Sequence, residues 1–172
     1  MGRVIITGAN GSGKSHFAKR LSEARPDLPL YSFDAVKLTT NWQTRPREEI
    51  DQDLSRLVDT PSWILEGGPS LLPIALPPAD AVVWLNPSFA TRAWRLARRP
   101  WQHLGQTRPE LPAGNPDQLG MQYRFALKSL RKEKSFRNQI AGELRGAKHA
   151  QIFTCSNRSD IAAALGALGT GS

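Results

Sequence analysis

The sequence predicts an α/β fold in which a parallel sheet is covered by helices on both faces. Short apolar runs typical of buried strands alternate with helix-like stretches five times along the chain, and this alternation is the pattern of parallel sheets. The length of 172 residues fits one compact domain, and 40% hydrophobic residues provide a core of ordinary size. We therefore expect residues 1–172 to form a single domain.

The most specific motif follows the first predicted strand, residues 3–7. Gly8-Ala9-Asn10-Gly11-Ser12-Gly13-Lys14-Ser15 matches G-x-x-x-x-G-K-[ST] at every fixed position, and a helical pattern over residues 14–24 follows it. In this context the glycines let successive N–H groups point at one anion, and the helix N-terminus adds partial positive charge. The segment, called the P-loop below, predicts a bound nucleoside triphosphate such as ATP.

Each P-loop residue type has a chemical reason. Lys14 would reach the β- and γ-phosphates, and the Ser15 hydroxyl would ligate Mg²⁺. An ordinary glycine-rich turn between a strand and a helix is the alternative, but it would need neither the lysine nor the hydroxyl. The residues expected to contact the nucleotide here are Gly8, Ala9, Asn10, Gly11, Ser12, Gly13, Lys14, Ser15 and His16.

Carboxylates end the next two predicted strands. The second strand, residues 28–33, ends at Asp34, and the third, residues 62–66, ends at Glu66. Ligands of open parallel sheets bind at the carboxyl ends of the strands. Asp34 is therefore a candidate base for an acceptor hydroxyl, and Glu66 a candidate to orient Mg²⁺. The alternatives are a helix cap or turn carboxylate for Asp34 and a strand-end turn carboxylate for Glu66.

Between these strands we expect a polar loop over residues 35–45 and a helix that opens at Pro46 and ends before Pro61. After Glu66, the glycines Gly67 and Gly68 would let an acceptor approach the backbone closely. Residues 70–79 are rich in proline and predict a short turn or helix.

Arginines follow the fourth predicted strand, residues 81–85. On the helix predicted over residues 86–99, helical spacing places Arg92, Arg95 and Arg99 on one face. These side chains would project towards the phosphates or would simply form a solvated face. The stretch of residues 100–116 is rich in proline and glycine and contains Arg108, and its length suggests a lid.

The last third of the chain predicts a long helix, a strand and a final helix. The long helix covers residues 117–144 and the fifth strand residues 150–154. Asn157 and Asp160 have the spacing of a capping box at the start of a helix over residues 161–168.

Composition excludes several classes of site. The lone Cys155 cannot form an intrachain disulfide, and with three histidines lacking metal-ligand spacing it cannot build a zinc site. No run approaches the length of a membrane span, and no signal-peptide pattern is present, so we expect a cytoplasmic protein without a membrane partner.

The order of these motifs resembles the adenylate-kinase-like group of P-loop kinases. Within it the chain is most similar to small bacterial proteins called DNA topology modulation protein or FlaR-related. The matching segments are the P-loop, Asp34 with Trp42 downstream, Glu66-Gly67, residues 79–85, the arginine helix 92–99 and Gly105-Gln106-Thr107-Arg108-Pro109-Glu110.

This resemblance implies a three-layer P-loop NTPase fold with sheet order 2-3-1-4-5, ATP as donor and a mobile lid. Arg108 would close over the transferring phosphate with help from one or two of Arg95, Arg98, Arg99 and Arg124. The loop entering the last helix would place Asn157 and Arg158 against the base. Two departures, Ser70 in place of a phosphate-gripping arginine and no Gly-Asp-x-x-Arg after Asp34, argue against a nucleoside monophosphate acceptor.

Two functions remain open from the sequence. The first is a Mg·ATP-dependent kinase with Lys14, Asp34, Arg99 and Arg108 as catalytic residues. The second is a nucleotide-dependent DNA- or RNA-binding regulatory NTPase, which the net charge of +8 supports. Its basic cluster, which is also compatible with a plain solvated face, consists of Lys128, Arg131, Lys132, Lys134 and Arg137. A polynucleotide 5′-hydroxyl kinase would satisfy both patterns.

Overall fold

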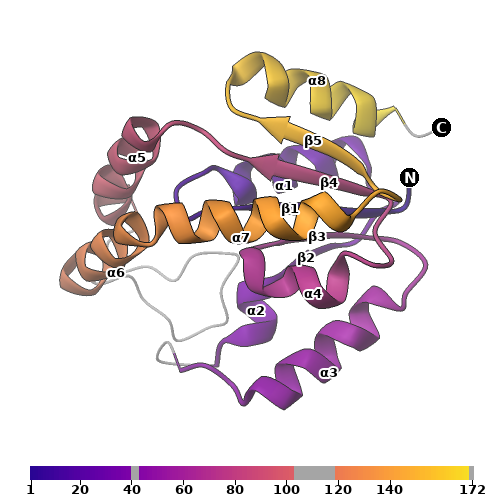
Figure 1. The fold of residues 1–172 in the computed structure, drawn as a ribbon, viewed down its shortest axis with the longest axis horizontal. Coiled ribbons are helices and arrows are strands. Elements are labelled where there is room, and N and C mark those ends of the chain that lie inside the picture. The colour runs from indigo at the N-terminus through magenta and orange to yellow at the C-terminus, as the bar shows by residue number, and fades with distance from the viewer. Residues whose placement is uncertain (40–42, 103–118, 171–172) are drawn as a thin grey trace.

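A computed structural model of the chain describes residues 1–39, 43–102 and 119–170. Its centre is a parallel sheet in the order β2-β3-β1-β4-β5, which confirms the predicted fold class and strand order (Figure 1). The strands are β1 (Arg3–Gly8), β2 (Leu30–Ser32), β3 (Trp63–Gly67), β4 (Ala81–Leu85) and β5 (Gln151–Cys155).

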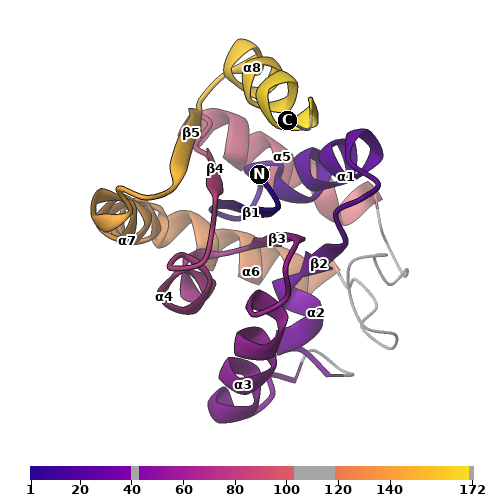
Figure 2. The ribbon, with the colours of Figure 1, turned by 90° about the vertical axis from the view of Figure 1, so that its right-hand side faces the viewer.

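Helices connect the strands and cover both faces of the sheet. They are α1 (Lys14–Ala24), α2 (Phe33–Lys37), α3 (Arg47–Val58), the short 3₁₀ turn η2 (Pro69–Leu71), α4 (Leu72–Ala75), α5 (Phe89–Gln102), α6 (Leu119–Arg131), α7 (Glu133–Gly146) and α8 (Arg158–Gly169). Viewed nearly along the strands, α1 and α8 lie on one side of the sheet, and α3, α4 and α7 lie on the other (Figure 2).

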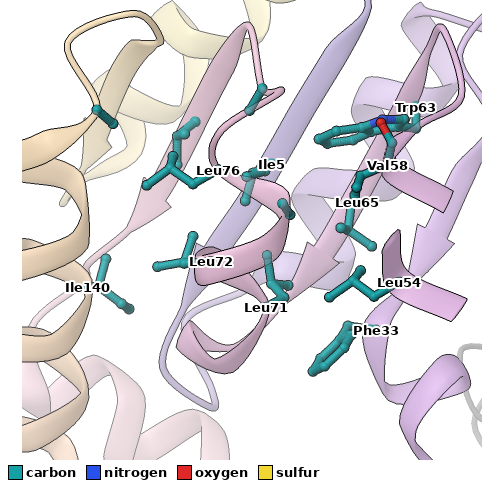
Figure 3. Close-up of a cluster of buried hydrophobic side chains, with 14 of the residues drawn as sticks. Ile5, Phe33, Leu54, Val58, Trp63, Leu65, Leu71, Leu72, Leu76 and Ile140 are labelled. Atoms are coloured by element: carbon teal, nitrogen blue, oxygen red, sulfur yellow. The ribbon is translucent and has the colours of Figure 1, made fainter. Parts of the chain in front are cut away.

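The two faces of the central strands fill two separate hydrophobic cores. Ile5, Leu65 and Val82 point towards α3, α4 and α7, whereas Val4, Ile64 and Val83 point towards α1 and α8. Strands buried on both faces need continuous apolar runs, and this explains why β1, β3 and β4 lack polar alternation. Figure 3 shows the first core, where Trp63 and Leu71 are fully buried.

The predicted boundary between the second strand and the loop that follows it is wrong. Residues 33–37 form the short helix α2 instead of extending a strand and a loop, and Leu38 then pairs with Thr44 in an isolated antiparallel bridge. Asp34 thus lies in the first turn of α2 and not directly at a strand end. Ser32 adopts extended angles as the N-cap of α2 and ends β2.

The predicted helix over residues 117–144 is two helices, α6 and α7. The break lies at Lys132, whose ψ of 5° is not helical, although its N–H still donates to the Lys128 carbonyl at 3.2 Å. The apolar periodicity is similar on both sides of the break, so it gave no signal of the bend. The predicted lid, residues 100–116, lies mostly outside the described residues.

The final helix begins with the expected capping box. The Asn157 carboxamide oxygen accepts the Asp160 N–H at 3.0 Å, and the Asp160 carboxylate accepts the Asn157 N–H at 3.2 Å. Across the described ranges, no helix is both long enough and apolar enough to cross a bilayer.

Adjacent glycines at the end of β3 provide a matched test of this packing. A Cβ atom on Gly67 would collide with the Leu71 side chain and lie 2.7 Å from the Phe33 Cβ, whereas a Cβ on Gly68 would meet open space. We expect Gly67→Ala to lower the free energy of unfolding by about 1–3 kcal/mol through overpacking, and Gly68→Ala to change it by less than about 0.5 kcal/mol. Urea denaturation measures the free energy of unfolding of both variants. Equal denaturation midpoints for the two would contradict the close packing of Gly67 against Leu71 and Phe33.

Candidate functional site

The P-loop forms a tight turn that depends on glycine. Gly8, Gly11 and Gly13 have φ angles of 152°, 78° and 101°, a region that side chains with a Cβ rarely adopt. A Cβ on Gly8 would also collide with the Leu85 carbonyl. The Ser12 N–H donates to the Ala9 carbonyl at 3.1 Å and closes the turn in front of α1. The loop therefore has the strand–turn–helix geometry that the motif predicts.

Two arginines of α5 bind the P-loop from its outer side. Arg95 Nη1 donates to the Ser12 carbonyl at 2.8 Å and lies 3.4 Å from the Gly11 carbonyl. Arg92 Nε donates to the Asn10 carbonyl at 3.1 Å. Two of the three arginines on the predicted face, Arg92 and Arg95, thus bond to carbonyls of the P-loop itself. Arg99 lies in α5 with its side chain outside the described part of the chain, and Arg108 lies outside it altogether.

The Lys14 side chain folds back over the P-loop. Its Nζ lies 3.4 Å from the Ala9 carbonyl oxygen. Burial of the ammonium group lowers the pKa of Lys14 below its ordinary value of 10.5, while the negative charges of Glu66 and Asp34 oppose this shift and the positive charge of Arg92 adds to it. Lys14 is therefore close to both predicted carboxylates.

Glu66 connects the P-loop to the neighbouring strand. Its side chain is only 5% exposed, and in the sheet it lies level with Ile6 of β1 and Ser32 of β2. Ser15 Oγ donates to one carboxylate oxygen at 3.5 Å, and Ser32 Oγ donates to the other at 3.0 Å. Two hydroxyls, one from the start of α1 and one from the end of β2, therefore fix the orientation of this carboxylate.

Ser32 was missed in the sequence. A hydroxyl residue two positions before the candidate base was the available signal, but the pairing that sets Ser32 opposite Glu66 becomes visible only in the sheet register. Ser32 is also the N-cap residue of α2, although its hydroxyl bonds to Glu66 and not to the helix, so the residue that holds the Glu66 carboxylate directly precedes the helix that carries Asp34.

The oxygen pair of Ser15 and Glu66 fits Mg²⁺ better than a transition metal. Mg²⁺ prefers hard oxygen ligands and usually keeps several waters or phosphate oxygens, so one or two protein ligands are sufficient. Within the described ranges, no group of three or more His, Cys, Asp or Glu side chains could form a dedicated metal cage. These residues fit an ion that arrives with a nucleotide.

On the acceptor side, Asp34 is exposed and Arg45 is already engaged. Asp34 lies in the first turn of α2 with its side chain open to solvent. The Arg45 guanidinium pairs with Asp53 at 2.8 Å and with Glu49 at 3.2 Å, and donates to the Val36 carbonyl at 3.1 Å. Arg45 thus holds the loop after α2 on α3.

The remaining predicted contacts are dispersed. His16 is exposed in the first turn of α1. Asn157 and Arg158 lie where β5 leads into α8, and the Asn157 carboxamide oxygen is occupied by the Asp160 N–H and by Ser159 Oγ at 2.7 Å. The structure thus gives Asn157 a capping role, and its contact with a base stays a prediction.

Comparison with known proteins supports the fold. Similar solved structures include a sugar kinase from Janibacter sp. (TM-score 0.55, 14% identity, covering 99% of this chain and 100% of that one). They also include a shikimate kinase from Bacteroides thetaiotaomicron (TM-score 0.52, 20% identity, covering 96% of this chain and 95% of that one). A third is a gluconokinase from Sinorhizobium meliloti (TM-score 0.52, 17% identity, covering 98% of this chain and 93% of that one). No protein-family model and no curated protein matches the sequence. At these identities the comparisons establish that the chain has a P-loop kinase-like fold.

The partly buried charge of Lys14 is expected to have a measurable cost in stability. Because its pKa is lowered from 10.5 in the fold, the unfolded chain binds this proton more tightly, so stability rises with pH between the lowered pKa and the ordinary one. We expect Lys14→Met to raise the free energy of unfolding at neutral pH while nucleotide binding is lost. This increase in the free energy of unfolding should become smaller as the pH approaches 10.5, the ordinary pKa of lysine.

Urea denaturation at the two pH values measures this effect. Lys19→Met, an exposed change on the same helix, is the control and should leave stability nearly unchanged. A Lys14→Met protein that unfolds more easily than the wild type at neutral pH would show that the lysine stabilises the free protein.

Proposed function

We propose that the protein transfers the γ-phosphate of Mg·ATP to a hydroxyl group of a small polar acceptor. The observation that carries this proposal is that Glu66 contacts both the P-loop and the segment that leads to Asp34. Its carboxylate accepts hydrogen bonds from Ser15 of the P-loop and from Ser32, the residue that directly precedes the helix that carries Asp34. The P-loop, the Glu66 carboxylate and the start of the helix that carries Asp34 thus lie at one edge of the sheet, and this proximity supports roles for them in binding the donor, orienting the metal and activating the acceptor.

Each residue would have a separate task. The P-loop N–H groups and Lys14 would hold the triphosphate, and Ser15 with Glu66 would hold Mg²⁺. The bound ion would neutralise charge that develops between the β- and γ-phosphates. Asp34 would accept the proton of the attacking hydroxyl, because its exposed carboxylate lies near enough to Lys14 to influence the lysine pKa. Arg99 and Arg108 are proposed to stabilise the transferring phosphate.

Several features favour a hydroxyl acceptor over a nucleoside monophosphate. A phosphate on the acceptor would typically be bound by the two parallel N–H donors of an arginine guanidinium. Arg45 lies on the acceptor side, but its guanidinium is already paired with Asp53 and Glu49. Gly68 faces open space next to the site and would admit an acceptor close to the backbone. The similar folds named above belong to proteins described as sugar kinase, shikimate kinase and gluconokinase, which supports a polyhydroxylated acceptor. The likeness to the adenylate-kinase-like and FlaR-related proteins rests on the sequence motifs alone.

The 5′-hydroxyl of a nucleic acid is a second candidate acceptor, larger than the small polar acceptor proposed above but of the same chemical group. Lys128, Arg131, Lys132 and Lys134 are exposed at the junction of α6 and α7, and such a cationic surface would attract a polyanion. A salt-sensitive interaction with DNA or RNA in the absence of acceptor-dependent turnover would instead favour the regulatory NTPase.

The role of Asp34 gives the direct test. With a panel of polyols, hydroxy acids, nucleosides and 5′-hydroxyl oligonucleotides, acceptor-dependent ADP formation identifies the substrate. We expect Asp34→Asn to bind Mg·ATP as the wild type does and to lower kcat about 10²–10⁴-fold, because the carboxamide cannot accept the hydroxyl proton.

Glu48→Gln, an exposed carboxylate change at the start of α3, is the matched control and should retain full turnover. An Asp34→Asn protein with unchanged kcat on the identified acceptor would remove Asp34 from the mechanism. ATP hydrolysis that no acceptor stimulates would remove the kinase assignment.

A further inference from the structure

A buried arginine lies directly behind the P-loop. Arg92 is 2% exposed, and its Nε donates to the Asn10 carbonyl at 3.1 Å. Its Nη1 lies 3.3 Å from a carboxylate oxygen of Glu133, the first residue of α7, whose side chain is 16% exposed. Through this single side chain the P-loop is joined to a helix that begins about 120 residues later in the chain.

Stability alone does not explain this arrangement. Burial lowers the pKa of the Arg92 guanidinium, and the neighbouring Glu133 opposes that shift. The Nη2 atom is buried and has no hydrogen-bond partner among the described residues. A buried ion pair that is incompletely satisfied generally contributes less to stability than apolar side chains of similar volume. Arg92 therefore occupies a position where an apolar residue would pack at lower cost.

The bond to Asn10 controls the direction of a P-loop N–H group. In a trans peptide the carbonyl and the following N–H point in opposite directions. Because Arg92 holds the Asn10 carbonyl outwards, the Gly11 N–H points to the inner side of the loop. Arg95 acts in the same way on the Ser12 carbonyl and the Gly13 N–H. Both glycines have positive φ angles and would otherwise have freedom to turn.

We propose that Arg92 is a positioning residue that preorganises the P-loop for a triphosphate, and that Glu133 holds the Arg92 guanidinium in place. The effect would combine an oriented N–H group with a fixed positive charge, since Arg92 is close enough to Lys14 to influence its pKa. N–H groups that already point at the anion site bind an anion without the free-energy cost of reorienting the backbone. This proposal rests on the proposed nucleotide binding at the P-loop.

The surroundings of Arg92 allow a clean substitution. A small cavity adjoins the ion pair between the P-loop and α7, and is lined in part by Ala9, Trp84 and Ile140. The unbranched side chain of methionine can adapt to irregular space, and Asn86 and Arg137, which also line the cavity, keep their mutual hydrogen bond of 2.9 Å. Arg92→Met combined with Glu133→Gln removes both buried charges and leaves no carboxylate unpaired.

Isothermal titration with the non-hydrolysable analogue Mg·AMPPNP tests the proposal. We expect the Arg92→Met/Glu133→Gln protein to melt no lower than the wild type but to bind the analogue about 10- to 100-fold more weakly, the range for one lost hydrogen bond to a charged donor. In turnover, KM for ATP should rise by a similar factor, with a smaller change in kcat. Glu143→Gln/Arg145→Met makes the same change in composition elsewhere on α7 and should bind normally.

Arg92→Lys is the second variant, in case the double variant folds poorly. An ammonium group lacks the fork that bonds to the Asn10 carbonyl and the Glu133 carboxylate together, so weakened binding in a protein of normal melting temperature is expected. Wild-type affinity in either folded variant would overturn the positioning role and leave the proposed function standing. A wild-type protein that fails to bind the analogue would overturn the nucleotide site and this proposal with it.

Discussion

The parallel pairing of β1 with β3, and of β3 with β2, is the constraint on which the candidate site depends. It sets the end of each strand at the same edge of the sheet, with Glu66 level with Ser32. The hydroxyls of Ser15 and Ser32 can then reach the two oxygens of one carboxylate. A slip of one residue would turn Glu66 to the other face, so the continuous apolar cores above and below β3 also fix the chemistry at its end.

A second feature is the placement of cations on both sides of the P-loop. Lys14 lies over the loop, whereas Arg92 and Arg95 bind its carbonyls from the outer side. Positive charge on the outer side orients the backbone dipoles inwards, and both α5 and α7 take part through Arg92 and Glu133. Figure 1 shows α5 and α6 together at one end of the molecule, on either side of the predicted lid in the sequence.

Local patterns were sufficient to predict the P-loop, the five strands and the capping box at Asn157, because each depends on neighbours in sequence. The short helix α2 escaped prediction because tertiary packing, with Phe33 buried against Gly67, decides its conformation over weak propensity. Ser32 and the Arg92–Glu133 pair escaped for a different reason. Their partners are distant in the chain, and helical spacing showed which face Arg92 occupies but not which groups meet it.

Phosphorus NMR of the wild-type protein with Mg·ATP and a mixture of hydroxylated acceptors tests the central claim most directly, because it observes the transferred group itself. The account predicts a new phosphomonoester signal that grows at the rate at which ADP appears. Formation of inorganic phosphate alone would contradict phosphoryl transfer to an acceptor and would point to a hydrolase. Unchanged ATP over many hours with every acceptor class would contradict catalysis at this edge of the sheet.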